Sequence, residues 1–547
     1  MGWATERLER WLAGLGGRGV ALLLLVLTLA ALLPGFTTLP PVDRDEARFA
    51  QATRQMLASG DFTDIRFQDG PRYKKPVGIY RLQSAAVALT GAPEAAPIWR
   101  YRLPSLLAVL LAVLATARAA ALFGEVQAGL FAGLMLGGAV LAGVEARLAT
   151  TDAVLLACVT LAGAVLARLY RDTVAAGFSP GVVLRPARVA LFWGALAASV
   201  LVKGPIGPLV IGGAVAGLAA WHRRAGWLRA VRPVWGLAGF VVLVVPWFLA
   251  ISIKSGGAFW AEALGRDLLG KVAEAQESHG APPGSYLAAL WLMFFPGSVV
   301  LAVSLPALWR GRRAAWLALA LAWVLPLWLV LEASPTKLPH YVLPLYPALA
   351  LALAQVWAGV VRGGLKAWQW ALGGALGLLA PLGLAATGVF AAGFGAVAWA
   401  PLLAGGVVVA AGAVLAVAAA RRRLAGVALI GLWAMGAGLA GGVVATLARV
   451  PALWPAQAVV ALVAEHAACP APVIFAAGYG EPSLVFLSPG EVRFVTAPEA
   501  LAALAADPCA LALLPLAGAV AGARLLGEVQ GVNLGNGAPL ALGLYAR

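Results

Sequence analysis

Four lysines lie close to apolar segments, in a chain that has only seven lysines among 547 residues. Lys74 and Lys75 are adjacent in "PRYKKPVGIY", Lys203 lies in "LVKGPIGP", and Lys337 lies in "SPTKLPHYVLPLYP". Cations that converge on one cavity bind an anion, and here we predict a phosphate held at a membrane surface. For the adjacent pair, a solvated position in a long loop is the alternative.

Carboxylates recur in two segments that could face the same cavity, "PVDRDEARFAQATRQML" with Asp45 and "EARLATTDAV" with Asp152. A carboxylate on each of two loops of one bundle suits acid/base or substrate-positioning chemistry. Both residues also have a purely structural interpretation. The spacing from Asp43 to Glu46 is that of a capping box before a helix over 47–58, and Asp152 could be a helix N-cap.

The composition requires a membrane protein. Only 12% of the residues are charged and 62% are hydrophobic, with a mean hydropathy of +0.88. Uncharged runs of the roughly 20 residues needed to cross a bilayer recur along the chain, and such continuous apolar runs fit helices rather than barrel strands. The net charge of +16 does not indicate nucleic acid, because the basic residues are mostly arginines in short clusters between apolar runs.

The arginine clusters set the predicted topology, because short basic loops stay in the cytoplasm. Three arginines precede a signal anchor at 20–36, which places the N-terminus inside. The segment 77–90 is apolar but short, and counting it as a span would invert every later loop, so we place it on the outer face. The 13 predicted spans are 20–36, 103–122, 126–144, 153–168, 189–202, 205–221, 234–252, 286–308, 314–331, 341–361, 370–391, 398–420 and 424–446.

This topology divides the chain into a transmembrane domain, 1–446, and an extracytoplasmic α/β domain, 447–547. Residues 37–102 form the first outer loop. The α/β domain contains Cys469 and Cys509, for which a disulfide and two free thiols are both open. Six of the seven lysines fall outside, which adds Lys254 and Lys271 to the four above.

A fourth outer loop contributes further basic residues. Arg266, Lys271 and His279 lie in it, and its portion 258–275 is amphipathic, as expected of an interfacial helix. The four histidines of the chain are in four separate segments, so no metal constellation is visible.

The motifs have a recognisable order: "DEARFA", then "RYKKP", an aspartate before span four, "KGP" after span five and "KLPHY" before span ten. The chain resembles the membrane-embedded class C glycosyltransferases, and among them the lipid A aminoarabinose transferases and dolichyl-phosphate-mannose-protein mannosyltransferase-like proteins. The resemblance implies a polyprenyl-phosphate-linked sugar donor, a periplasmic active site at the bacterial inner membrane, and inverting transfer without a metal or other cofactor.

The resemblance also assigns roles to residues. Asp45 and Asp152 match catalytic positions, and Lys75 matches the donor-phosphate lysine. Binding of the donor phosphate and lipid is predicted for Lys75, Arg266, Lys337, Tyr341, Lys74, Lys203, Arg48 and His340.

One residue departs from the family pattern. The aminoarabinose transferases tend to have glutamate where this chain has Lys74, and a lysine would repel a cationic amino sugar. We therefore expect a neutral or acidic sugar. The expected acceptor is lipid A or another envelope glycolipid, the alternatives are a protein acceptor or a lipid-linked saccharide flippase, and the expected state is a monomer.

Overall fold

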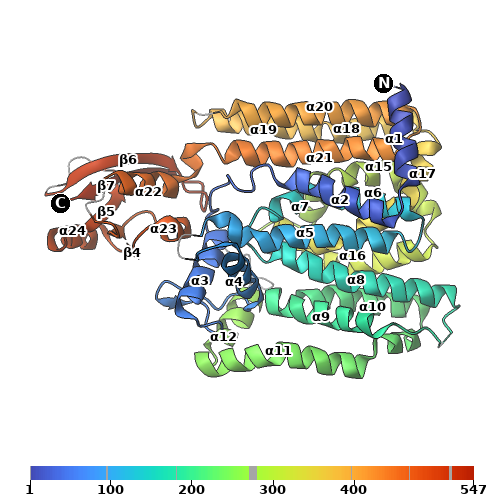
Figure 1. Cartoon of the computed structure of the whole chain (residues 1–547), viewed down its shortest axis with the longest axis horizontal. Helices are drawn as coiled ribbons and strands as arrows, with labels where there is room; N and C mark the ends of the chain where they lie inside the picture. Colours follow the sequence, from blue (N-terminus) through green and yellow to red (C-terminus); the bar gives the residue numbers. More distant parts are fainter. Residues whose placement is uncertain are drawn as a thin grey trace.

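The computed structural model describes residues 2–93, 96–179, 181–269, 280–395, 397–466, 469–516, 520 and 522–547, with the side chains of 266–269 left out. Figure 1 shows long helices side by side in one bundle, with a mixed sheet domain projecting from one end. We call this end of the bundle the domain end. The predicted fold class, a polytopic helical membrane protein with a small C-terminal α/β domain, is confirmed.

Each of the 13 predicted spans coincides with one helix or with two consecutive helices. Within the described residues, nine helical segments are long and apolar enough to cross a membrane, and a bent pair with a 111° angle makes a tenth. The remaining three spans coincide with shorter apolar helices. In chain order the segments are α2 (Gly17–Leu32), α5 (Ile98–Ala120), α6 (Val126–Gly137) with α7 (Val140–Glu145), α8 (Asp152–Ala175), α9 (Pro186–Lys203), α10 (Ile206–His222), α11 (Pro233–Ser255), the bent pair α14 (Ser285–Met293) and α15 (Gly297–Arg310), α16 (Ala315–Ala333), η3 (Pro339–Leu345) with α17 (Tyr346–Arg362), α18 (Ala367–Gly377) with α19 (Leu379–Ala392), α20 (Trp399–Arg421) and α21 (Ala425–Leu447).

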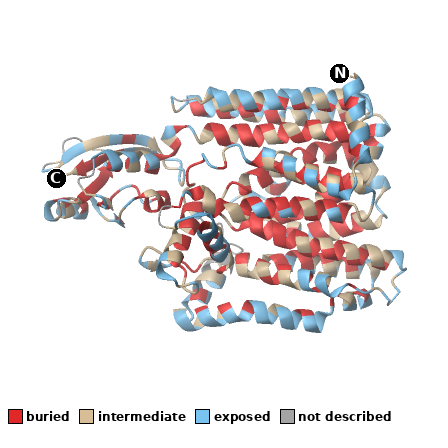
Figure 2. Cartoon of the chain, viewed as in Figure 1, coloured by how far each residue is buried: buried red, intermediate tan, exposed pale blue. Residues whose placement is uncertain are grey.

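Burial separates inner helices from outer ones. Figure 2 shows α5 and α8 mostly buried and α11 mostly exposed. The exposed side chains of α11 are large and apolar, Val242 and Leu249 among them. An apolar helix exposed in this way is suited to contact with lipid chains.

The first loop folds against the domain end of the bundle. It forms α3 (Asp45–Ser59), a short hairpin of β1 (Arg66–Phe67) and β2 (Gly70–Pro71), and α4 (Gly78–Thr90). A Cβ on Gly78 would lie 2.7 Å from the Leu201 carbonyl oxygen, so the glycine lets α4 approach α9 closely. The N-terminal helix α1 (Gly2–Gly14) lies at the opposite end, as the predicted topology requires (Figure 1).

The C-terminal domain is a five-stranded mixed sheet with helices. Its strands have the order β4-β3-β5-β7-β6, in which β3 pairs parallel with β4 and β5, and β7 pairs antiparallel with β5 and β6. The elements are η4 (Pro451–Leu453), α22 (Pro455–His466), β3 (Val473–Ala476), α23 (Pro482–Leu487), β4 (Val492–Phe494), α24 (Ala497–Ala506), β5 (Ala510–Pro515), β6 (Arg524–Val532) and β7 (Pro539–Ala546).

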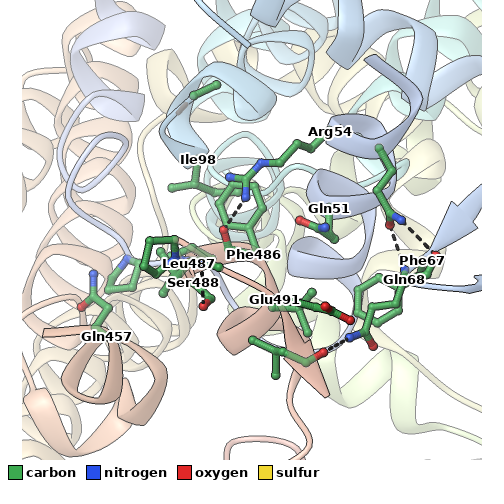
Figure 3. Close-up of a pocket in the computed structure, with 18 of the residues that line it drawn as sticks. Gln51, Arg54, Phe67, Gln68, Ile98, Gln457, Phe486, Leu487, Ser488 and Glu491 are labelled. Atoms are coloured by element: carbon green, nitrogen blue, oxygen red, sulfur yellow. Dashed lines mark hydrogen bonds between the residues drawn. The ribbon is translucent and has the colours of Figure 1, made fainter. Parts of the chain in front are cut away.

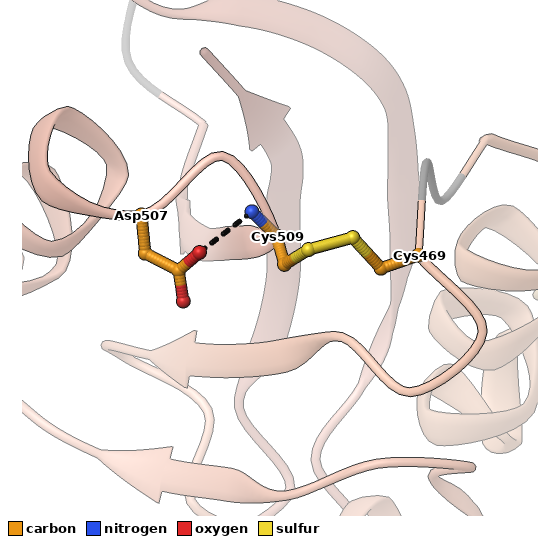
Figure 4. The surroundings of a disulfide bond; sticks show 3 residues. All are labelled: Cys469, Asp507 and Cys509. Atoms are coloured by element: carbon orange, nitrogen blue, oxygen red, sulfur yellow. Dashed lines mark hydrogen bonds between the residues drawn. A yellow bond between two sulfur atoms is a disulfide. The ribbon is translucent and has the colours of Figure 1, made fainter.

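A disulfide joins Cys469 and Cys509, the pairing that the sequence left open (Figure 4). The two cysteines precede β3 and β5, which are parallel neighbours in the sheet, so both lie at the same edge. The bond closes a segment of 40 residues that includes β4 and α24. Such a cross-link limits the conformational freedom of the unfolded domain.

Candidate active site

A cavity of about 830 Å³ lies at the domain end of the bundle, between its helices. Most of its wall is apolar and comes from α9, α10, α11 and α16, with Phe259 and Trp260 of the short helix α12 (Ala258–Trp260). We call it the apolar cavity. Five predicted site residues line it: Lys74, Lys75, Asp152, Lys203 and Tyr341.

An ion pair between two helix ends contributes part of the charge in this cavity. Asp152 begins α8 and Lys203 ends α9, and Lys203 Nζ lies 2.5 Å from Asp152 Oδ1. The helix dipoles favour a carboxylate at an N-terminus and an ammonium at a C-terminus. Gly204 follows with φ 65° and lets the chain turn directly after the lysine. Lys203 Nζ also lies 5.3 Å above the Tyr341 ring, so three predicted residues are together.

His340 connects this pair to a second buried carboxylate. Its Nε2 is 3.9 Å from Asp152 Oδ2, and its Nδ1 is 3.8 Å from Glu145 Oε1. Glu145 is buried and accepts a hydrogen bond from Thr150 Oγ1 at 3.0 Å. The predicted residue His340 is therefore adjacent to Asp152. Within the part of the chain that the structure describes, no three His, Cys, Asp or Glu side chains are grouped as metal ligands.

The other predicted cations are placed differently. Lys337 is buried, and its ammonium donates to the carbonyl of Ser334, which lines the apolar cavity. Arg266 belongs to η2 (Ala261–Leu269), which contributes Ala263 and Leu264 to the cavity wall, but its side chain lies outside the described residues. Lys271 and His279 also lie outside them, as do residues 270–275 of the predicted interfacial helix over 258–275.

A second cavity of about 700 Å³ adjoins the first loop and a turn of the C-terminal domain. We call it the basic cavity, because Arg44, Arg48, Arg72 and Lys74 line it against one acid, Glu262. Lys74 lines both cavities and therefore marks where they meet. Of the predicted residues, Arg48 lines the basic cavity only.

Asp45 reaches the basic cavity through an arginine that we did not single out from the sequence. Asp45 Oδ1 lies 3.5 Å from Arg72 Nη2, and the Arg72 guanidinium lies 4.9 Å from the centre of the Phe49 ring. Arg72 is buried whereas Asp45 is exposed. The signal for Arg72 was its position in the "RYKKP" motif, two residues before the lysine pair.

Both capping interpretations are wrong. Arg44, with φ 68°, is the N-cap of α3, and Asp43 instead accepts a hydrogen bond from the Ser483 N–H of the C-terminal domain at 3.1 Å. The N-cap of α8 is Thr151, and Asp152 is the first residue inside the helix. The competing contacts come from distant parts of the chain, which local spacing does not reveal.

A second buried ion pair, also not singled out from the sequence, supports the first loop. Arg102 Nε and Nη2 each lie 2.8 Å from an oxygen of Glu46. Arg102 also donates to three carbonyl groups of 36–40, and Glu46 accepts from the N–H groups of Val42 and Ala149. The sequence feature that could have drawn attention to Arg102 is its position at the start of a long apolar run.

The bundle, the apolar cavity and the mixed-sheet domain define a polytopic membrane protein with the fold of ArnT. Crystal structures of ArnT from Cupriavidus metallidurans, apo and bound to undecaprenyl phosphate, give TM-scores of 0.74 and 0.73 at 21% and 20% identity. Each comparison covers 95% of this chain and 97% of the other. The resemblance predicted from the ordered motifs is confirmed.

Curated proteins of similar sequence are also aminoarabinose transferases, at low identity. The "undecaprenyl phosphate-alpha-4-amino-4-deoxy-L-arabinose arabinosyl transferase 2" of Pseudomonas fluorescens (strain Pf0-1) is 27% identical over 320 residues, 58% of this chain and 56% of the relative. The corresponding transferase of Yersinia enterocolitica is 34% identical over 119 residues, 22% of this chain and 21% of the relative. The chain thus matches only about half the length of the first of these relatives. No family model matches.

Proposed function

We propose that this protein transfers a sugar from a polyprenyl-phosphate donor to an envelope glycolipid, on the outer face of the bacterial inner membrane. The observation that carries the proposal is the apolar cavity. Most of its lining is apolar, and Lys75 and Lys203 add positive charge to it. A prenyl chain fits such a wall, and a phosphate fits its cationic end. The domain end would then be periplasmic and the N-terminus cytoplasmic.

The cations would act on the leaving phosphate. Negative charge develops on it as the glycosidic bond breaks, and preorganised cations in a water-poor site stabilise that charge. Lys75 and Lys203 would contact the phosphate, with Tyr341 beside them, and Asp152 would hold Lys203 in place. Arg266 and Lys337 remain predicted contributors to the same phosphate site.

The acceptor would enter through the basic cavity. Its arginines suit an anionic glycolipid such as lipid A, and Asp45 would orient or deprotonate the acceptor hydroxyl, or position an acceptor phosphate that needs no base. An Asp45→Asn variant should fold normally and lose transfer by about 100-fold or more if Asp45 is a base. Wild-type turnover by this variant would remove the base from the mechanism.

The sugar would be neutral or acidic, because Lys74 lies where the two cavities meet. The curated relatives are named for an amino sugar, which is cationic at neutral pH. Competition between undecaprenyl-phosphate donors carrying aminoarabinose, a neutral hexose or a uronic acid tests this. Preferred transfer of aminoarabinose would contradict it.

Transfer itself is tested with the purified full chain in detergent, a polyprenyl-phosphate donor with a radiolabelled sugar, and lipid A as acceptor. We expect labelled glycolipid and free polyprenyl phosphate. Movement of the intact donor across reconstituted vesicles without bond cleavage would instead identify a transporter. Radiolabel found in a protein would support the proposed donor site and show that the acceptor is a protein rather than a glycolipid.

A further inference from the structure

A third cavity, of about 1520 Å³, separates the C-terminal domain from the first loop. Figure 3 shows Gln51 and Arg54 of α3 on one side, and Phe486 and Ser488 of the C-terminal domain across from them. We call this space the interdomain crevice. The transfer reaction proposed above does not use it.

The lining of the crevice is polar but electrically balanced. Two bases, Arg54 and Arg493, stand against two acids, Asp69 and Glu491. The remaining polar groups are neutral amides and hydroxyls: Gln51, Gln55, Gln68, Gln457, Thr37, Thr38 and Ser488. The basic cavity, in contrast, has four cations against one acid. The crevice therefore suits a ligand rich in hydroxyl groups rather than an anion.

Two groups of the wall are available to a ligand. Gln51 Oε1 is buried and has no hydrogen-bond partner among the described residues, which leaves an acceptor for a ligand hydroxyl. Phe494 of β4 is 40% exposed although its ring is apolar. An aromatic face beside amides is suited to sugar rings, whose C–H faces are apolar and whose rims carry hydroxyls.

Direct contacts join the two walls of the crevice and fix their relative positions. Arg54 Nη1 donates to the Phe486 carbonyl at 2.7 Å, and its guanidinium lies 4.2 Å from the centre of the Phe486 ring. Gln68 Nε2 donates to the Val492 carbonyl at 2.7 Å. Val492 belongs to β4, the edge strand of the sheet, so this side chain occupies a carbonyl that an added peptide strand would need.

From this geometry we infer that the interdomain crevice binds the saccharide chain of the acceptor, while the basic cavity takes its anionic group. The inference rests on the proposed function, because it names the part of the acceptor that this site holds. An extended peptide fits less well, because of the Gln68 contact with the edge strand.

Calorimetry tests binding independently of transfer. The full chain in detergent is titrated with the core oligosaccharide of lipopolysaccharide, released by mild acid and dephosphorylated so that the basic cavity is not engaged. We expect wild-type binding, and binding weakened about tenfold by Phe494→Ala and by Gln51→Ala. Leu525→Ala is the matched control, because Leu525 is a similarly exposed apolar residue on β6 at the far edge of the same sheet.

Kinetics separate this inference from the proposed function. Phe494→Ala should raise KM about tenfold for a glycolipid acceptor that carries core sugars and leave KM unchanged for lipid A without them. Equal KM changes on both acceptors, no oligosaccharide binding by the wild type, or binding of an extended peptide in its place would each overturn the inference. Binding without any transfer would uphold the crevice and overturn the proposed function instead.

Discussion

Two buried ion pairs at the domain end differ in how completely they are satisfied. In the Arg102–Glu46 pair the side chains are 0% and 1% exposed, and other parts of the chain take up the remaining donors and acceptors. In the Lys203–Asp152 pair they are 11% and 7% exposed, and both residues line the apolar cavity.

The difference distinguishes a structural pair from a pair that can receive a ligand. Arg102 has five N–H donors, and all of them are directed at protein oxygens, so this pair fixes the first loop against the bundle. An ammonium has three donors, and Lys203 directs one at Asp152 while it borders the cavity. The Lys203–Asp152 pair is therefore positioned to bind an anion in the cavity.

The largest expected effect is on the structural pair. Glu46→Gln leaves a buried guanidinium without its countercharge, and we expect a loss of about 3–5 kcal/mol in the free energy of unfolding. Thermal unfolding in detergent measures it. Asp172→Asn is the control, since the Arg168–Asp172 pair is solvent-accessible, with side chains 35% and 26% exposed, and should cost less than about 1 kcal/mol. Equal effects of the two changes would contradict the distinction.

Lys75→Met should lower turnover about 100- to 1000-fold with the protein still folded, because it removes a cation from the end of the apolar cavity where we propose that the donor phosphate binds. The matched control is Lys254→Met, since Lys254 lies at the same end of the bundle, pairs with Asp61 and is 45% exposed. Sugar transfer by the purified proteins is the measurement. A similar loss in both variants would mean that general charge, not the cavity, matters.

Asp43 extends the comparison to a half-buried carboxylate, which accepts hydrogen bonds from the Ser483 N–H and the Tyr479 hydroxyl, both uncharged donors. Burial raises its pKa from 3.8 to about 6, with nearby Glu481 adding to the shift. The protonated form is favoured in the docked state, so docking of α23 on α3 is tightest below about pH 4 and weakens up to about pH 6. The change is about a hundredfold in the docking equilibrium.

Hydrogen exchange in α23 as a function of pH checks this. Asp43→Asn should keep the contact with Ser483, slow the exchange at pH 7 and remove its pH dependence. Exchange in the wild type that is slower at pH 7 than at pH 4, after correction for intrinsic rates, would reverse the expected sign.

The smallest effect is expected from Lys74→Glu, which reverses a charge where the two cavities meet. We expect donor preference to shift about tenfold toward a cationic amino sugar, the order expected for a partly solvated charge. Competing donors in one reaction measure the ratio. An unchanged ratio of the two transferred sugars would show that Lys74 does not determine which sugar is preferred.

The sequence predicted the bundle better than the site. Apolar length is a local signal, so each of the 13 predicted spans falls on apolar helix, and nine or ten of these segments are long enough to cross a membrane within the described residues. The arginine clusters predicted the sidedness of the loops, which stays a prediction. The adjacent residues Asp45 and Glu46 show the limit. Nothing local indicates that Glu46 pairs with Arg102, 56 residues later, while Asp45 remains exposed beside Arg72.

The division of the candidate site into an apolar cavity and a basic cavity could also not be predicted from the sequence. The basic cavity is closed by a turn at Gly535 and Asn536, nearly 500 residues after Arg44. Docking of the C-terminal domain on the first loop creates it, and such long-range contacts leave no periodic pattern in the chain. The ordered motifs supplied candidate site residues without showing which of them share a wall.

We propose that Lys75 and Lys203 bind a phosphate at the end of the apolar cavity. Native mass spectrometry of the full chain with equal amounts of undecaprenyl phosphate and undecaprenol tests it most directly. The wild type should retain the phosphate lipid at least about tenfold over the alcohol, and Lys75→Met should lose that preference. Equal retention of the two lipids by the wild type, or an unchanged preference in Lys75→Met, would mean that these lysines do not select the phosphate.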